Sequence, residues 1–320
     1  MSLIFKKPGI LTTVQDLGRT GSQSAGINPN GVMDAAAARL INAILGNDDS
    51  AAVLEMHFPA AEIEFDEGTV FALGGADLGA ELDGRELRNW CSSFAKKGSV
   101  LKFAARRSGN RAYLGALGGF EIDKWLGSSS TNLAVGGGSF SGRRLIAGDR
   151  LDVSGSSEKI RELKIGPSII PRYSRFPTVR IIAGCEFEFL TANSERMFLS
   201  EGFTFTRDCD RMGYRLSGTP LHLLHERQMV SSAVTFGTVQ LLPDGQIIIL
   251  MADHQTSGGY PRIANVVSAD LPILAQCGPG DGVSFAMISV AEAELLAVEF
   301  ENELNFLRVG CRLRNHDSDD

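Results

Sequence analysis

Short β-rich runs separated by glycine constrain the fold of this chain more than any other feature. Its 320 residues include 36 glycines but only 11 prolines, and most glycines lie between runs of apolar and β-branched residues. Short strands with frequent turn signals are typical of a mainly antiparallel, barrel-like β architecture. The strand candidates are residues 61–65, 69–73, 100–104, 112–116, 178–182, 238–242 and 247–251. Pro243-Asp244-Gly245 is a tight hairpin signal between the last two.

Three segments have the pattern of amphipathic helices. Residues 34–45 place apolar side chains on one face and end at a glycine. A shorter segment, 268–276, precedes a Gly-Pro-Gly sequence. In the third, 289–307, Ser289 and Glu292 form a capping-box pair. Its apolar stripe consists of Leu296, Phe300, Leu304 and Leu307. We therefore predict a mainly β (β-rich α+β) fold with a few helices.

A weak internal echo indicates that the chain has two halves. The run Asp16-Leu17-Gly18-Arg19 and the run 210–215 are each followed by an acidic-glycine turn, a strand and an Ala-Asp pair. A chain of this length holds one large domain or two ordinary ones. We predict an N-terminal β-rich half over residues 1–155 and a C-terminal β-barrel half over 156–320, with a polar joint at 154–159.

Charge and cysteine usage limit the class of protein. The formal net charge is −7, which argues against a general nucleic-acid binder because such proteins need a basic surface. The N-terminus lacks the apolar core of a secretory signal, and no apolar stretch is long enough to span a bilayer. Five scattered cysteines are most simply reduced thiols. We therefore expect a cytoplasmic protein without a membrane segment.

A polar motif directly after an apolar strand is the best candidate for a site. Asp253-His254-Gln255-Thr256-Ser257-Gly258-Gly259-Tyr260-Pro261 follows the run 247–252. Two adjacent glycines let a backbone approach a ligand closely, and a rigid strand that ends in polar side chains builds many binding sites. The alternative is an ordinary strand-to-loop transition whose polar side chains face water, and the residues alone favour neither.

Two further polar runs accompany it. The run 207–216 contains three arginines, two aspartates, a glycine and a tyrosine. An arginine presents a planar fork of donors that matches carboxylates and phosphates, although a solvated charged turn is the commoner explanation for such a run. Near the N-terminus, the run 12–19 precedes Gly26-Ile27-Asn28-Pro29-Asn30-Gly31-Val32-Met33-Asp34.

The usual signatures of metal, hydrolase and nucleotide chemistry are weak. The only close histidine pair is His222 and His225, without patterned carboxylates nearby, so we predict no metal in the chain. No nucleophile elbow and no Walker-type phosphate loop occur. The glycine-rich run 136–144 would cradle an anion with two arginines, but as a lone run it is more often a turn.

The polar runs, taken together in order, carry a family resemblance. The chain resembles the biotin-dependent carboxyltransferase family that includes allophanate hydrolase subunit 2, KipA and the C-type subunit of 5-oxoprolinase. The matching positions are 13–19, 31–34, 46–47, 54–55, 74–77, 113–114, 118–119, 129–131, 142–143, 210–218, 237–240, 253–261, 269–271 and 276–280. Departures are Asn30 where Ser is usual, Ser257 where Thr is usual, and the acidic tail after Arg314.

The resemblance implies a fold and an activity. It implies two cyclophilin-like β-barrel halves. It implies a subunit of an ATP-dependent 5-oxoprolinase, which opens the lactam 5-oxoproline to glutamate, and kinship with the carboxyltransferase domain of urea carboxylase. The partners would be a KipI-like protein (the B-type subunit of 5-oxoprolinase) and a lactam-utilisation protein (its A-type subunit). ATP would act in the complex, and carboxybiotin would be carried by a partner.

The same resemblance suggests roles for individual residues. Asp253 would handle a proton or orient the ligand, and Tyr260 and Arg215 complete the predicted catalytic group. The predicted substrate-binding residues are Arg211, Tyr214 (as a wall), Gln255, Thr256, Gly258, Gly259, Asp16, Arg19 and Asp34. Structural alternatives remain for the last three: Asp16 and Arg19 would pair with each other, and Asp34 would cap its helix.

A second function belongs to another class. Like KipA, the chain would be a non-enzymatic regulatory protein that binds a KipI-like kinase inhibitor. A sizeable exposed apolar strand or groove would favour this alternative.

Overall fold

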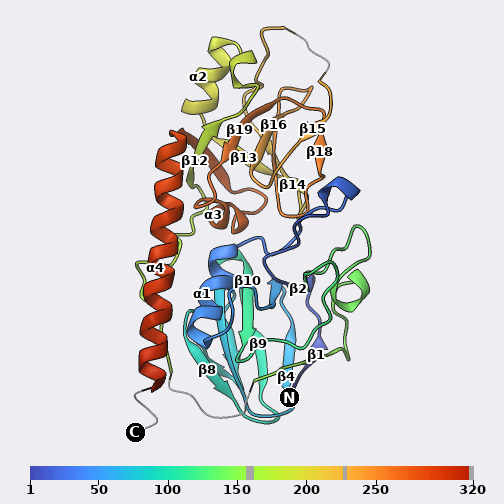
Figure 1. The fold of residues 1–320 in the computed structure, drawn as a ribbon, viewed down its shortest axis with the longest axis vertical. Helices are drawn as coiled ribbons and strands as arrows, with labels where there is room; N and C mark the ends of the chain where they lie inside the picture. Colours follow the sequence, from blue (N-terminus) through green and yellow to red (C-terminus); the bar gives the residue numbers. More distant parts are fainter. Residues whose placement is uncertain (156–161, 226–228, 317–320) are drawn as a thin grey trace. The chain divides into compact units, whose positions relative to one another are not determined.

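The computed structural model describes residues 1–155, 162–225 and 229–316, and within these ranges the protein is mainly β (Figure 1). It divides into two compact units. Unit 1 consists of Met1–Arg19, Asp34–Pro171 and Phe300–Asp320, and unit 2 of Thr20–Met33 and Arg172–Glu299. The main chain passes from unit 1 to unit 2 after Arg19 and again after Pro171. Residues 156–159 of the expected joint lie outside the described ranges.

Unit 1 contains two antiparallel sheets rather than one closed ring of strands. The six-stranded sheet has the order β11 (Arg150–Asp152), β1 (Ser2–Lys7), β4 (Glu62–Phe65), β9 (Val100–Phe103), β6 (Ala80–Leu82), β7 (Arg85–Glu86). The five-stranded sheet has the order β2 (Thr12–Gln15), β3 (Val53–His57), β10 (Ser108–Ala116), β5 (Thr69–Asp77), β8 (Ser92–Ala95). Alternate side chains of both sheets, such as Phe5, Phe65 and Phe71, form one buried core.

Helix α1 (Ala35–Leu45) packs on a glycine surface of unit 1. Gly74 lies in β5, and a Cβ there would be 2.7 Å from Cγ2 of Ile41. Gly115 lies in β10, where a Cβ would be 3.1 Å from Cδ1 of Leu45. Two strand glycines therefore make room for the apolar face of the helix, which explains why glycine occurs inside otherwise regular strands.

Unit 2 is a closed barrel of seven strands. Its order is β12 (Thr178–Ala183), β19 (Arg262–Val266), β16 (Thr238–Leu241), β17 (Ile247–Leu250), β14 (Gly213–Ser217), β13 (Phe203–Cys209), β20 (Gly282–Met287). The barrel closes through parallel pairing of β12 with β20, and the other neighbours pair antiparallel. A short ribbon of β15 (Ser232–Ala233) and β18 (Ser257–Gly258) lies apart from it. The core of unit 2 is apolar and includes Met33 from the segment Thr20–Met33.

The remaining helices are short, except for the last one. Unit 2 contains α2 (Ala192–Ser200) and α3 (Leu271–Ala275), and 3-10 turns occur at Gln23–Ala25, Ser139–Gly142 and Phe187–Phe189. Helix α4 (Val290–His316) is 27 residues long, with residues up to Glu299 assigned to unit 2 and later ones to unit 1. The capping box is confirmed, because Ser289 N–H donates to Glu292 and Glu292 N–H donates to Ser289 Oγ. Within the described residues, no helix is both long and apolar enough to cross a membrane.

The predicted strands and helices agree closely with the structure. Every strand candidate coincides with or lies within one residue of a strand, and the hairpin between β16 and β17 is present. Helix α3 is shorter than expected, and α4 extends nine residues beyond the predicted end at 307 (316 against 307). The expectation of a mainly β fold with a barrel is confirmed.

Asp34 caps α1 and provides a test of the fold. Its Oδ1 accepts the Ala37 N–H at 2.8 Å, and the side chain is fully buried. Replacing Asp34 with Ala should lower the free energy of unfolding by about 1 kcal/mol or more, because the cap is lost inside the protein. Asp34→Asn keeps an acceptor and should lose much less. Urea unfolding measures both, and equal losses would contradict the cap.

Candidate functional site

The run 207–216 and the motif 253–261 meet at one end of the barrel of unit 2. Strands β14 and β17 are antiparallel, with Gly213 opposite Leu250, so the loop before β14 adjoins the loop after β17. Two main-chain hydrogen bonds connect the loops: Met251 N–H donates to Met212 O at 3.0 Å, and Asp253 N–H donates to Arg211 O at 2.7 Å. The register of the barrel therefore brings together two motifs that lie about forty residues apart in sequence.

A buried ion pair fixes these loops to each other. Arg211 donates from Nε to Oδ2 of Asp253 and from Nη2 to Oδ1, both at 2.9 Å. The two side chains are 6% and 7% exposed. A bidentate pair of this kind is geometrically specific, and burial makes the loss of either partner costly.

The N-terminal motif joins the same ion pair. Arg211 Nη2 also donates to the carbonyl of Gly31, and the amide of Asn30 donates to Oδ1 of Asp253. Asn30 has a φ of 59°, a left-handed conformation that asparagine tolerates better than most residues. In the sequence, Asn30 differs from the serine that is usual in the family, and in the structure it is a direct hydrogen-bond partner of Asp253.

His254 is a buried member of the motif that the predicted site omitted. Its Nδ1 lies 2.6 Å from the carbonyl oxygen of Gln255, which can only accept, so Nδ1 carries the proton. Burial lowers the pKa of the imidazole, with the Gln255 hydrogen bond and the Asp253 charge acting in the opposite direction. His254 is therefore neutral near pH 7 and holds the backbone of the loop.

A cavity of about 580 Å³ lies on the outer face of unit 2, over strands β14, β16 and β17. Three predicted site residues line it, namely Arg215, Gln255 and Tyr260. The other lining residues are Arg207, Asp208, Cys209, Asp210, Met212, Gly213, Gln240, Leu242, Ile248 and Leu250. The cavity thus combines guanidinium, phenol and amide groups over an aliphatic floor. This composition suits a small polar ligand.

The alternation of β14 determines which of its side chains reach that cavity. Tyr214 and Leu216 point into the barrel, where Tyr214 contacts Phe205 edge-on with ring centroids 5.5 Å apart. Arg215, between them, points outward and pairs with Asp244, with Nη2 2.6 Å from Oδ2. The expectation that Tyr214 forms a wall of the site is therefore corrected, because its ring is a core residue with 1% exposure.

Two glutamines converge on Gly258. A Cβ at this glycine would lie 2.6 Å from Nε2 of Gln240 and 3.3 Å from Nε2 of Gln255. The backbone at Gly258 therefore needs the absence of a side chain for both amides to approach it. Gln240 comes from a different strand and was not predicted. Its position is difficult to infer without knowing that β16 also pairs with β19, where Gln240 lies opposite Arg262.

The other residues of the motif lie along its edge. The carbonyl of Thr256 accepts the Val234 N–H at 3.4 Å, and Gly258 pairs with Ser232. Gly259 and Tyr260 also line a second, larger groove of about 950 Å³. Its remaining lining residues are Leu221, His222, Leu223, Met229, Leu241, Leu242, Pro243 and Pro261.

Asp16 and Arg19 belong to unit 1 and contact one serine-rich turn. Asp16 accepts hydrogen bonds from the hydroxyls of Ser128 and Ser130 at 2.6 and 2.7 Å and from the Ser129 N–H at 2.6 Å. Arg19 donates to the carbonyl of Ser130 and stacks over Trp125, 4.8 Å from the ring centroid. Both side chains are buried, so they organise the turn 128–130.

Asp34 also belongs to unit 1, where it is the α1 cap described above. Its backbone N–H donates to the hydroxyl of Tyr113, which in turn donates to Glu55 at 2.8 Å. Burial raises the pKa of the Tyr113 phenol, so the ring stays neutral and donates. The helix-cap alternative for Asp34 is thus confirmed.

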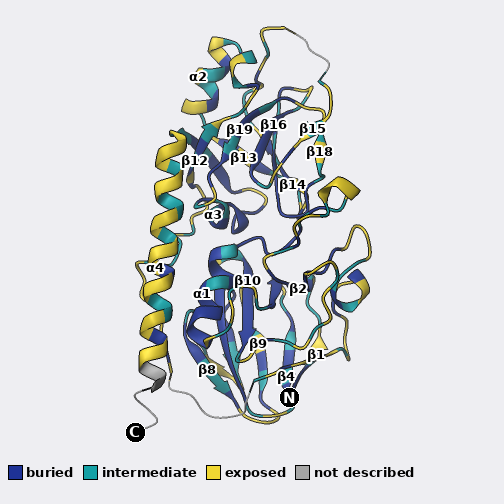
Figure 2. Ribbon diagram, in the orientation of Figure 1, coloured by how far each residue is buried: buried dark blue, intermediate teal, exposed yellow. Residues whose placement is uncertain are grey.

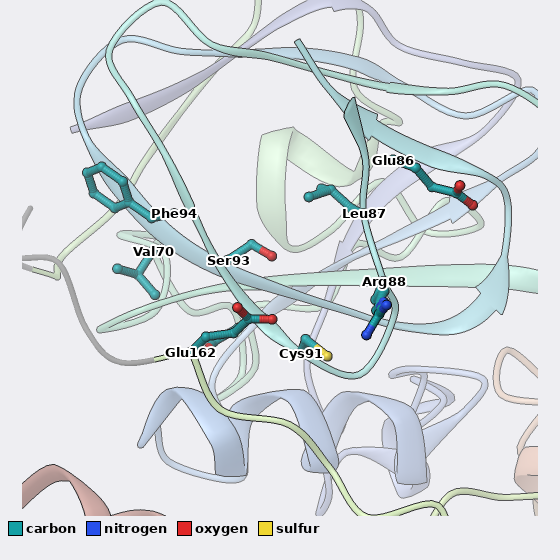
Figure 3. A pocket seen from close by; sticks show the side chains of 9 residues that line it. Val70, Glu86, Leu87, Arg88, Cys91, Ser93, Phe94 and Glu162 are labelled. Carbon is teal, nitrogen blue, oxygen red and sulfur yellow. The ribbon is translucent and has the colours of Figure 1, made fainter. Parts of the chain in front are cut away.

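A separate cavity in unit 1, of about 600 Å³, contains none of the predicted residues (Figure 3). Arg88, Cys91 and Glu162 lie along it. Burial raises the pKa of the Cys91 thiol, so the thiol is not activated as a nucleophile. In the run 136–144, Arg143 is held by Asp149 in a bidentate pair, with Nη1 2.6 Å from Oδ2. These features leave the unit 2 cavity as the candidate site.

Metal ligands do not cluster in the described part of the chain. Among residues 1–155, 162–225 and 229–316, no three His, Cys, Asp or Glu side chains are arranged to hold a metal ion. The sequence pair His222 and His225 is therefore not part of such a group.

Comparison with known proteins identifies the family to which this barrel and its polar cavity belong. The chain matches the family described as carboxyltransferase domain, subdomain A and B, over residues 25–287, and it belongs to this family. It is 36% identical over 296 residues to the 5-oxoprolinase C subunit of Haemophilus influenzae, covering 92% of this chain and 94% of that protein. It is 35% identical over 309 residues to the 5-oxoprolinase C subunit of Escherichia coli, covering 97% and 98%.

A solved structure shares the fold. The urea carboxylase of Kluyveromyces lactis superposes with a TM-score of 0.90 over 96% of this chain and 29% of that one, at 24% identity. The resemblance noted in the sequence is confirmed at the level of the family.

The two arginine pairs of the site should differ sharply in their effect on stability. Arg211→Met leaves the Asp253 carboxylate buried without its main partner, so we expect a loss of about 3–5 kcal/mol in the free energy of unfolding. Arg215→Met breaks an ion pair with a solvent-exposed aspartate and should leave that free energy nearly unchanged. Chemical denaturation of the two variants makes the comparison. Similar losses would show that the Arg211 pair does not hold the loops.

His254 should give stability a dependence on pH. Because its pKa is lowered in the folded protein, the unfolded chain takes up the proton first as pH falls. The contribution of His254 is complete above the unfolded pKa of about 6.5 and is lost as pH falls from there through the folded pKa. Urea unfolding across this range should show a flatter pH dependence for His254→Gln than for the wild type. Identical slopes would contradict the assignment.

Proposed function

We propose that this chain is the C-type subunit of an ATP-dependent 5-oxoprolinase and that the cavity on unit 2 binds the lactam. The reaction adds water to the ring carbonyl of 5-oxoproline and breaks its C–N bond to give glutamate, with ATP hydrolysis as the co-reaction in the complex. The observation that carries the proposal is that Arg215, Gln255 and Tyr260 line one cavity of a carboxyltransferase-family barrel. The similarity to two 5-oxoprolinase C subunits, over nearly their whole length, supports it.

The polar groups of the cavity match the parts of a lactam. A 5-oxoproline molecule has a carboxylate, a ring carbonyl and a ring N–H. The Arg215 guanidinium would bind the carboxylate, with Asp244 orienting the fork. The amides of Gln240 and Gln255 provide both donors and acceptors for the ring carbonyl and N–H. The Tyr260 side chain, 44% exposed, would deliver or accept a proton at the opened nitrogen.

Asp253 and Arg211 would act as positioning residues. Asp253 accepts hydrogen bonds from Arg211 and Asn30. Because its carboxylate is already engaged in this way, we favour the role of orienting the ligand over the role of transferring a proton. Thr256 and the glycines Gly258 and Gly259 would shape the rim. Asp16, Arg19 and Asp34 would support the first half of the chain rather than touch substrate.

Partners and cofactors follow from the same proposal. The chain would act with a KipI-like protein of the B type and a lactam-utilisation protein of the A type, in the cytoplasm. ATP would bind in the assembled complex. A carboxybiotin carried by a partner also fits the cavity, because its ureido group has the same carbonyl and N–H pattern as a lactam. When bound, it would supply an activated carboxyl group for transfer.

Turnover in a reconstituted complex tests the proposal. With A- and B-type subunits and ATP, the wild-type chain should support conversion of 5-oxoproline to glutamate. Arg215→Met and Tyr260→Phe should each lower kcat/KM about tenfold to a hundredfold, since each removes a hydrogen bond or charge contact to substrate. Arg150→Met removes a comparable exposed ion pair in unit 1 and serves as the control.

The outcomes separate the alternatives. Absence of turnover in the complete set, with all subunits folded, would remove the 5-oxoprolinase assignment. Inhibition of turnover by avidin would indicate a biotin-dependent route in place of direct lactam opening.

A second function is favoured by the larger groove of unit 2. Its lining residues Leu221, Leu223, Met229 and Pro243 are apolar, as a surface for a KipI-like kinase inhibitor requires. In that case the chain would be a regulatory protein without activity of its own. Capture of a KipI-like protein that Met229→Glu abolishes, together with no turnover in any subunit combination, would support this function.

A further inference from the structure

Helix α4 has a second apolar stripe, on the side away from the residues that anchor it. Its anchored side contains fully buried Leu304 and nearly buried Cys311. The opposite side exposes Leu295, Val298, Phe306, Val309 and Leu313, each between 54% and 79% exposed. Figure 2 shows exposed residues along much of α4. The family model ends at residue 287, before α4 begins.

The stripe has a regular spacing. Its members are Ala291, Leu295, Val298, Asn302, Phe306, Val309 and Leu313, and all seven are exposed. The steps between them are four, three, four, four, three and four residues, which is an eleven-residue repeat written twice. At 100° per residue all seven lie within about 40° of the direction of Asn302, so they form one straight face about 33 Å long.

The stripe is also palindromic about Asn302. Counting outwards, Val298 and Phe306 lie four residues away, Leu295 and Val309 seven, and Ala291 and Leu313 eleven. A second α4 laid antiparallel across a two-fold axis at Asn302 therefore sets apolar residues against apolar residues at every level. Such self-complementarity is what an isologous dimer requires.

The charges beside the stripe obey the same symmetry. The first half of α4 is acidic, with Glu292, Glu294, Glu299, Glu301 and Glu303, and the second half contains Arg308 and Arg312. In the antiparallel pair Glu294 of one copy and Arg312 of the other lie on the same flank of the stripe at nearly the same level, twice. One like-charge contact remains, between Glu299 of one copy and Glu303 of the other. A parallel pair would instead place acidic halves together.

We propose that the outer face of α4 is the docking site for a second copy of this chain, joined as an antiparallel helix pair with its two-fold axis at Asn302. The two Asn302 amides would donate to each other at the axis and fix the register, as single buried asparagines do in helix pairs. Because one helix pair gives an interface at the small end of the specific range, the association depends on protein concentration.

Sedimentation velocity over a concentration series tests the pairing with the full chain alone. The wild type should pass from monomer to dimer, and Phe306→Glu should remain monomeric at every concentration reached. Val230→Glu is the matched control, because Val230 is 84% exposed and lies off α4. It should dimerise like the wild type. Phe306 is exposed, so an unchanged melting temperature will show that the variant is folded.

Two further variants test the orientation. Glu294→Arg and Arg312→Glu should each weaken the dimer several-fold, and the double variant should restore it, because the charges exchange places. In a Cys185→Ser background, chains with Leu295→Cys should cross-link to chains with Val309→Cys and not to each other. Self-cross-linking of Leu295→Cys alone would indicate parallel pairing and overturn the proposal.

Other occupants of the face are also distinguished. A wild type that stays monomeric throughout, or a dimer that Phe306→Glu leaves intact, would overturn the proposal. If the monomeric chain instead lost binding to a KipI-like partner on the Phe306→Glu change, the face would belong to that partner.

Discussion

The ion pair between Arg211 and Asp253 is the constraint on which the candidate site depends. It connects the loop before β14, the loop after β17 and the segment that contains Asn30 and Gly31, all within unit 2. A buried pair of charges adds little net stability compared with apolar packing, but it permits only one arrangement of its fork. The main effect of this ion pair is therefore geometric, because it fixes the position of three irregular segments against the barrel.

This geometry separates a buried ion pair from an ion pair at the surface. Arg211 and Asp253 neutralise each other below the surface, whereas Arg215 lies outside the barrel, with an exposed partner, in the cavity. The strand period of two decides this division, because Tyr214 and Leu216 turn inward and Arg215 turns outward.

Much of this architecture could be predicted from residue patterns, and the failures have physical causes. Local signals placed the strands, the β16–β17 hairpin, the α1 cap and the α4 capping box correctly, because each depends on neighbours in sequence. The motifs around Gly213 and Asp253 were expected to meet, and they do. Tyr214 was misplaced because the inward or outward sense of a strand is set by the sheet. Gln240 and Asn30 were missed because only barrel pairing and the ion pair bring them to the site.

The segment Thr20–Met33 has a consequence for how the molecule is made. Met33 packs in the hydrophobic core of unit 2, although every strand of the barrel comes from residues 178–287. During synthesis, this early segment emerges long before the strands that it packs against, because residues of unit 1 lie between them. The core of unit 2 becomes complete only when the last strand has left the ribosome. Long sequence separation of this kind slows folding and prolongs the exposure of apolar surface. A C-terminal fragment that begins near the middle of the chain would contain all the barrel strands but would lack Met33, which is part of the core of unit 2.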